Sequence, residues 1–133
     1  MAEDCLYKQE TFELIGLTYK VFNRLGFGYQ EKYYQRAYAE ELRSAKKNYI
    51  RERKCVIVYN GKKIGRYFID FVVGNIVVEL KIANDAYLQH VQQVLGYLKA
   101  TGRPLGIIVV MTPHGVKIKR VINSTTISAK SVQ

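Results

Sequence analysis

The chain of 133 residues carries a formal net charge of +10, and 48% of its residues are apolar. This length suffices for one domain with a hydrophobic core but not for two, so we expect a single domain over residues 1–133, with residues 1–10 and 124–133 flexible. An acidic start and the absence of an apolar run near ~20 residues argue against a signal peptide and a membrane span, and Cys5 and Cys55, without disulfide or metal spacing, favour the reducing cytoplasm.

The first half of the chain predicts two amphipathic helices. Apolar residues recur at helical spacing from Thr11 to Leu25. The expected buried stripe of this helix is Phe12, Ile15, Tyr19 and Phe22. A second helix is predicted from Gln30 to Tyr49, and its apolar face also carries Glu31. The helix dipole stabilises a carboxylate in the first turn wherever it points, so capping explains Glu31 as well as an inward-facing role does.

The second half predicts five strands and one helix. The expected elements are Cys55–Tyr59, Lys63–Val73, Ile76–Ile82, a helix over Asp85–Thr101, Leu105–Met111 and Val116–Ile122. Asn60-Gly61 and Gly74-Asn75 are two-residue hairpin turn signals, so the first three strands should form a meander. Leu105–Met111 is apolar throughout, as a strand buried on both faces should be. The predicted fold class is therefore α/β, with a mixed central β-sheet flanked by helices.

The Gly74-Asn75 turn places two carboxylates opposite each other. If these two residues form the loop, Phe71 pairs with Val78, and Asp70 falls opposite Glu79. Lys81 then shares the face of Glu79. Like charges that face each other across strands, ~4.5–5.5 Å apart at Cβ, are destabilising, and a divalent cation between them is the simplest explanation. The alternative is a set of solvated strand-end charges in which Lys81 pairs with Glu79.

Most of the positive charge is concentrated in one segment, which contains nine basic residues and the single acid Glu52. The basic residues are Arg43, Lys46, Lys47, Arg51, Arg53, Lys54, Lys62, Lys63 and Arg66. A localised basic patch is typical of a protein that binds a polyanion, most often nucleic acid. A solvated face that only aids solubility is the alternative. His90 and His114 have no metal-ligand spacing, and we expect them to be structural or exposed.

The order of these elements and charges resembles the PD-(D/E)XK nuclease superfamily, and within it the GxxExxY proteins. Gly28, Glu31 and Tyr34 fit the motif that names the GxxExxY group. Asp70 followed by Glu79-Leu80-Lys81 fits the superfamily signature, although Ile69 stands where the superfamily's name implies proline. Gln93 and Tyr97 are similar to the QxxxY element of its RecB-like branch. The resemblance covers nearly the whole chain and implies a restriction-endonuclease-like core.

The resemblance also implies a role for each of these residues. Asp70 and Glu79 would be metal ligands for Mg²⁺ or Mn²⁺, and Glu31 a further acid of the metal site. Lys81 would orient or activate the attacking water, and Gln93 would support the substrate phosphate or the lysine. The expected substrate-binding residues are Lys46, Lys47, Arg51, Arg53, Lys62, Lys63, Arg66 and Tyr97.

Three classes of function are compatible with the sequence. The first is a metal-dependent nuclease acting on DNA, in repair, recombination or defence, and by analogy with small resolvase-type relatives it could be a homodimer. The second is a non-cleaving nucleic-acid-binding module of the same fold. The third is an interaction protein whose basic face meets an acidic partner. The carboxylate pair favours the nuclease, because opposed carboxylates near phosphates have no use in a pure binder.

Overall fold

The computed structural model describes residues 7–82 and 87–124, without the side chains of residues 87–89. Its elements are α2 (Lys8–Leu25), α3 (Glu31–Ser44), β1 (Ile50–Tyr59), β2 (Lys62–Val73), β3 (Ile76–Ile82), α4 (Tyr87–Thr101), β4 (Leu105–Thr112) and β5 (Gly115–Ile122). This order confirms the predicted α/β class. The expected helix start at Asp85, the residue Cys5 and most of the two chain ends fall outside the described residues. No helix in the described part is both long and apolar enough to cross a membrane.

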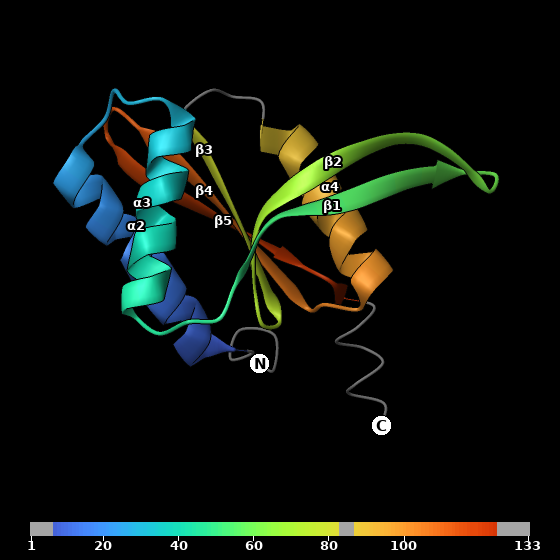
Figure 1. The fold of residues 1–133 in the computed structure, drawn as a ribbon, viewed down its shortest axis with the longest axis horizontal. Helices are drawn as coiled ribbons and strands as arrows, with labels where there is room; N and C mark the ends of the chain where they lie inside the picture. The colour runs from blue at the N-terminus through green and yellow to red at the C-terminus, as the bar shows by residue number, and fades with distance from the viewer. Residues whose placement is uncertain (1–6, 83–86, 125–133) are drawn as a thin grey trace.

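A five-stranded mixed sheet forms the middle layer, in the order β1-β2-β3-β4-β5. Strands β3 and β4 are parallel and are joined through α4, whereas the other neighbours are antiparallel. Helices α2 and α3 cover one face of the sheet, and α4 covers the other (Figure 1). Every residue of β4 is buried as a result, which explains its uninterrupted apolar sequence.

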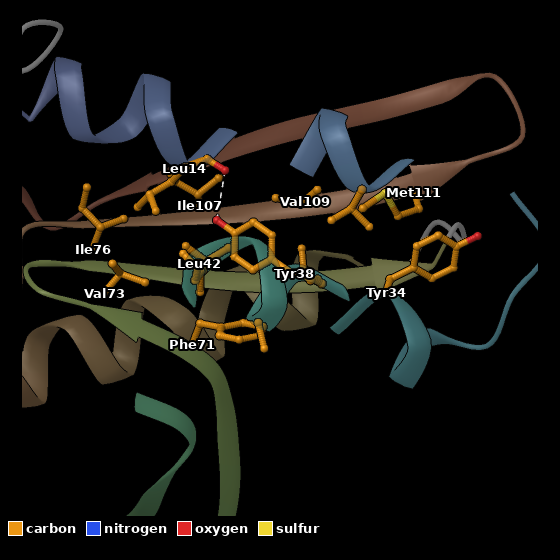
Figure 2. Close-up of a cluster of buried hydrophobic side chains, with 14 of the residues drawn as sticks. Leu14, Tyr34, Tyr38, Leu42, Phe71, Val73, Ile76, Ile107, Val109 and Met111 are labelled. Carbon is orange, nitrogen blue, oxygen red and sulfur yellow. Dashed lines mark hydrogen bonds between the residues drawn. The ribbon is translucent and has the colours of Figure 1, made fainter. Parts of the chain in front are cut away.

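The larger core lies between the sheet and the pair α2–α3 (Figure 2). Tyr38 of α3 is fully buried there, and its ring meets that of Phe71 edge to face at 5.1 Å between centroids. Its hydroxyl donates a hydrogen bond to the carbonyl of Leu14 in α2, at 3.0 Å (Figure 2). One side chain therefore packs against the sheet and also ties the two helices together, and it satisfies its own polar atom in doing so.

The buried stripe of α2 differs from the predicted one. The residues that the helix buries are Thr11, Leu14, Thr18 and Val21. Phe12 is 74% exposed and Tyr19 43% exposed, so these two predictions were wrong. Each buried position lies one residue before a predicted one, which rotates the helix by about 100°. The short threonine side chains suit the close contact with the neighbouring layer, and Thr18 bonds its hydroxyl to the Ile15 carbonyl at 2.6 Å.

Helix α3 ends at Ser44, five residues before the predicted end. Lys46 adopts a left-handed conformation (φ 59°), and the amide of Lys47 bonds the Leu42 carbonyl while that of Lys46 bonds the Arg43 carbonyl. This pair of bonds is the Schellman motif that ends many helices, usually at a glycine. Because a lysine occupies the position here, the sequence carries no stop signal. The chain turns early, and β1 begins at Ile50 rather than Cys55.

The hairpin of β1 and β2 extends beyond the rest of the sheet (Figure 1). β2 pairs with β3 only from Phe71 to Val73, yet it pairs with β1 along nearly its whole length. The register shifts between Ile57 and Val58, so one extra residue, Ile64, bulges from β2. We call the projecting part, residues 53–59 and 62–69, the arm.

Candidate metal and catalytic site

The predicted pairing of β2 and β3 around the Gly74-Asn75 turn is confirmed for all three apolar pairs. Beyond Phe71 and Val78 the backbone pairing of the two strands ends. There the carboxylates of Asp70 and Glu79 accept hydrogen bonds from backbone amides of the opposite strand. The Asp70 amide donates to Glu79 Oε1 at 2.6 Å. The Leu80 amide donates to Asp70 Oδ2 at 2.8 Å. Each carboxylate is therefore fixed by the backbone of the opposite strand, and the two groups lie side by side at the point where the sheet opens.

The other neighbour of β2 is also irregular at this level. Glu52 of β1 lies between the pairs Arg51–Phe71 and Arg53–Ile69, opposite Asp70 in register. Its φ of 53° is left-handed, which is uncommon for a residue other than glycine. Regular strand pairing is thus interrupted on both sides of Asp70, so this residue is not part of either backbone ladder.

The loop before α3 directs Glu31 towards the end of β3. Gly28 has φ 127°, a conformation that side chains disfavour. Tyr34 is fully buried, and its hydroxyl donates to the Gly26 carbonyl while accepting from the Tyr29 amide. These bonds fix the loop in front of α3, and Glu31 in the first turn of the helix accepts a hydrogen bond from the Ile82 amide at 3.3 Å. The three residues at G-x-x-E-x-x-Y spacing therefore act as a turn, an acid and a clamp.

Lys81 stands between two of the acids. Its Nζ lies 3.6 Å from Glu79 Oε2 and 3.8 Å from Glu31 Oε2. Burial lowers the pKa of Lys81, but the attraction of Asp70, Glu79 and Glu31 outweighs burial and leaves that pKa above its usual value. The side chain therefore remains an ammonium at neutral pH.

The positive charge near Asp70 and Glu79 is too small to balance their two carboxylates. Burial raises the pKa of Asp70 to about 6, against the opposing attraction of Lys81. Burial, and next the charge of Asp70, raise the pKa of Glu79 to about 8. Glu79 is only 3% exposed. One lysine does not compensate this cluster fully, and an additional cation would.

These residues fit a hard divalent cation. Asp70, Glu79 and Glu31 each use one oxygen to accept a backbone N–H. The second oxygens of Glu79 and Glu31 face Lys81, and a carboxylate oxygen with two lone pairs can accept such a contact and still coordinate a cation. Oxygen ligands are what Mg²⁺ and Mn²⁺ prefer, and Mg²⁺ keeps several waters, so two carboxylates suffice. Within residues 7–82 and 87–124, no three acidic, histidine or cysteine side chains are gathered into a complete metal site. Asp70 and Glu79 are bonded to each other's strands, and Lys81 lies between Glu79 and Glu31.

Helix α4 borders the same site, and the expected support of the substrate phosphate or of Lys81 by Gln93 stays a prediction. The structure brings the Gln93 carbonyl, not its amide group, into contact with β2, where it accepts a bond from the Tyr67 hydroxyl. Burial, and next the neighbouring Cys55, raise the pKa of Tyr67, and the charge of Glu79 adds to this shift. His90 is half-buried, and its side chain interacts with that of Gln93, one turn further along α4. Burial, and next the charge of Lys81, lower the pKa of His90.

Sequence reasoning missed three neighbours of the acids. Gln35, one turn after Glu31 on α3, bonds Glu31 Oε2 at 3.4 Å and lowers the pKa of Asp70 by a hydrogen bond. The i, i+4 spacing to Glu31 could have identified it. Tyr67 and His90 had no comparable signal, because their proximity depends on how α4 crosses the sheet.

The expected substrate-binding residues fall into two groups. Five are exposed, namely Lys46, Arg53, Lys62, Lys63 and Arg66. The other three are engaged elsewhere: Lys47 forms an ion pair with Glu13 of α2, Arg51 lies 5.3 Å over the ring of Phe71, and Tyr97 is 3% exposed. Tyr97 packs in the core beneath α4, with Arg103 over its ring at 5.8 Å. A direct substrate contact by Tyr97 is therefore not supported, because its ring is buried.

The raised carboxyl pKa values predict a pH-dependent effect of Mg²⁺ on stability. Groups with a raised folded-state pKa stabilise the fold below their unfolded pKa of about 4, and this contribution is lost as pH rises. Without metal, stability should therefore fall through pKa values of about 6 and about 8. A cation at the carboxylates should offset this loss, so Mg²⁺ should raise Tm more near pH 8.5 than near pH 5.5.

The measurement is thermal unfolding in EDTA and in excess Mg²⁺ at both pH values. Glu79→Gln should reduce the difference between the two pH values, because the amide does not titrate. Exposed Glu40 is the matched control, and Glu40→Gln should leave the difference unchanged. Equal Mg²⁺ shifts at both pH values would contradict a cation at Asp70 and Glu79.

Comparison with known proteins provides a family and a fold. The sequence model of the PD-(D/E)XK nuclease superfamily matches residues 8–121. No curated protein matches the chain at a significant level. The crystal structure of SSO0001 is similar, with a TM-score of 0.53, 22% sequence identity and coverage of 94% of this chain and 65% of that chain. At this identity the likeness shows the fold alone, and the present chain spans about two thirds of the length of that protein.

Proposed function

Because the chain belongs to the PD-(D/E)XK nuclease superfamily, we propose that it is a Mg²⁺- or Mn²⁺-dependent nuclease that cleaves DNA. The observation that supports this most strongly is the carboxylate pair of half-buried Asp70 and buried Glu79, each fixed by the other's strand, with Lys81 beside Glu79. Burial, and next the charge of Asp70, raise the pKa of Glu79, and a cation between the two carboxylates would relieve this repulsion. A phosphodiester substrate supplies the anion that the cation and lysine would hold.

Each side chain then has a distinct task in the proposed reaction. Asp70 and Glu79 hold the cation, and Glu31 assists directly or through water. A bound divalent cation would supply a water of lowered pKa and polarise the phosphoryl oxygen. Lys81 remains protonated among the three acids, so it stabilises negative charge that builds up on the phosphate rather than removing a proton.

Within the superfamily we assign the chain to the GxxExxY group. The support is that Gly28, Glu31 and Tyr34 form one unit, in which the turn and the tyrosine clamp place the acid at the end of β3. The spacing of the three residues matters because the tyrosine must reach back to the turn for the acid to be fixed at the start of the helix. The assignment makes Glu31 a member of the site rather than only a helix cap.

The second candidate is a nucleic-acid-binding module that does not cleave. The exposed cations of the arm would suffice for binding, since phosphate contacts require only positive charge. The pair of Asp70 and Glu79 weighs against it, because a module that only binds gains nothing from negative charge near phosphates. An interaction protein with a basic face would share the arm but would bind nucleic acid no better than other polyanions.

The proposed function is tested with labelled duplex, single-stranded and branched DNAs, each incubated with Mg²⁺, Mn²⁺ or EDTA. We expect cleavage of at least one DNA with either metal and none in EDTA. Binding without cleavage in every metal would favour the second candidate. Cleavage that continues in excess EDTA would exclude the metal-dependent mechanism. A parallel RNA substrate shows whether the sugar is discriminated.

A further inference from the structure

The arm has one covered face and one open face. Because paired residues on neighbouring strands share a face, Cys55 and Tyr67 lie together on the covered side. Both pack against the cluster beneath α4, and the Tyr67 hydroxyl bonds the Gln93 carbonyl. The opposite face, which begins with the pair Lys54–Phe68, is the open side.

The bulge at Ile64 concentrates positive charge on the open face. In a regular strand, Lys63 would point to the face opposite that of Arg66, since side chains alternate. One extra residue reverses this alternation, and Lys63 becomes the partner of Val58. A shallow hollow of about 340 Å³ results, lined by Lys54, Val56, Lys63, Gly65 and Arg66. Three cations thus surround an apolar floor, and no acid lies between Arg53 and Ile69 in the sequence.

Apolar side chains of the arm are exposed to an unusual degree. Val58 is 58% exposed and Phe68 49%, with the guanidinium of Arg66 over the Phe68 ring at 5.8 Å. At the tip, Tyr59 and Ile64 are each 65% exposed. Contiguous exposed apolar surface with a charged rim is typical of a binding surface.

The charge decides between the two occupants that such a face could take. A second copy of the chain would place the same three cations opposite one another in a two-fold interface, and like charges at an interface cost several kcal/mol. Nucleic acid has the complementary charge along its whole backbone. The exposed aromatic and apolar groups of the arm can contact sugars and base edges.

We propose that the open face of the arm binds the duplex flanking the cleavage site, which makes double-stranded DNA with a flank of defined length the preferred substrate. A two-stranded β-ribbon fits the major groove of B-DNA. Lys54, Lys63 and Arg66 contact phosphates, and Tyr59 and Ile64 at the tip enter the groove. This inference rests on the proposed nuclease function, because it takes Asp70 as the point of cleavage.

The length of the arm sets the length of the flank. Lys62 is eight residues from Asp70 along β2. At ~3.3 Å per residue these span at most ~26 Å, which corresponds to about eight base pairs at ~3.4 Å each. A flank of about eight base pairs on the arm side should therefore give full affinity, and a shorter flank should leave the tip without a partner.

The test measures affinity by fluorescence anisotropy in EDTA and cleavage in Mg²⁺, on stem–loop duplexes whose two flanks are trimmed separately from about twelve to about four base pairs. The wild-type chain should lose about tenfold in affinity when the arm-side flank falls below about eight base pairs, since about two phosphate contacts disappear. The double variant Lys63→Gln, Arg66→Gln should bind the long duplex about tenfold more weakly and show no dependence on flank length. A matched control, Lys117→Gln with Lys119→Gln, removes the same charge from exposed positions on β5 and should retain the dependence.

Failure of this inference can be distinguished from failure of the proposed function. Cleavage that is indifferent to flank length and to the arm variant would overturn the arm's role and leave the nuclease intact. Flank-dependent binding without cleavage would support the arm and exclude the nuclease. Tighter binding of single strands than of duplex, or dimerisation that the arm variant abolishes without any effect on DNA affinity, would also overturn the inference.

Discussion

Replacing Asp70 with Asn, or Glu79 with Gln, should abolish metal-dependent cleavage while DNA binding stays the same or becomes slightly tighter. Both carboxylates are expected to hold one cation, so the loss of either removes its site. Binding should not suffer, because each change removes a negative charge near the phosphates. The measurement is cleavage of the preferred DNA in Mg²⁺, with affinity measured in EDTA.

Protein stability separates lost chemistry from lost folding in this experiment. Burial raises the pKa values of both acids, so their charged forms are unfavourable in the metal-free protein at high pH. The neutral variants should therefore melt at the same or a higher temperature than the wild type near pH 8 in EDTA. Glu40→Gln, at an exposed position, is the control that should retain cleavage. Full activity in Asp70→Asn would exclude the proposed metal site.

Replacing Lys81 with Met should reduce cleavage by a factor of about 100 or more, comparable with the loss of one donor to a developing oxyanion. The ammonium lies within 4 Å of Glu79 and Glu31, and in the complex it would face the phosphate bound to the cation that these acids hold. Met preserves the length and packing of the aliphatic chain but not the charge.

The effect should appear in the rate of the chemical step at saturating DNA, because the lysine acts on charge that develops during the reaction. Mg²⁺ should still raise Tm in this variant, since Asp70 and Glu79 are retained. Lys119→Met, at an exposed position of β5, serves as the control and should cleave like the wild type. If Lys81→Met cleaved normally, the lysine would be only a structural partner of the two glutamates.

The local part of the site could be predicted from sequence. Gly74 and Asn75 permit only a short reversal, so the pairing of Phe71 with Val78 followed from the count of residues in the turn. The same count placed Asp70 and Glu79 together. The helical period likewise turned Glu31 to the side of Tyr34 and Tyr38, both of which are buried.

Other features could not be predicted from local patterns. Lys46 takes a left-handed conformation that is usually left to glycine, so the end of α3 was placed too late. Val58 and Lys63 became partners through a bulge at Ile64. The neighbouring Gly65 is compatible with a bulge but does not by itself fix its position. Both depend on contacts that the rest of the fold makes available, which outweigh local preference.

The sequence by itself determined which chemical groups approach one another across short loops, because turns and periods act over a few residues. The tertiary structure alone decided the environment of those groups. β2 leaves β3 at Asp70, so the two carboxylates bond backbone amides of the opposite strands, and Glu79 becomes buried while Asp70 is half-buried. Helix α4 packs across the sheet, and this packing brings the Tyr67 hydroxyl to the Gln93 carbonyl and buries Tyr97. Burial and charge depend on segments distant in the chain, and these set the pKa values on which the proposed chemistry rests.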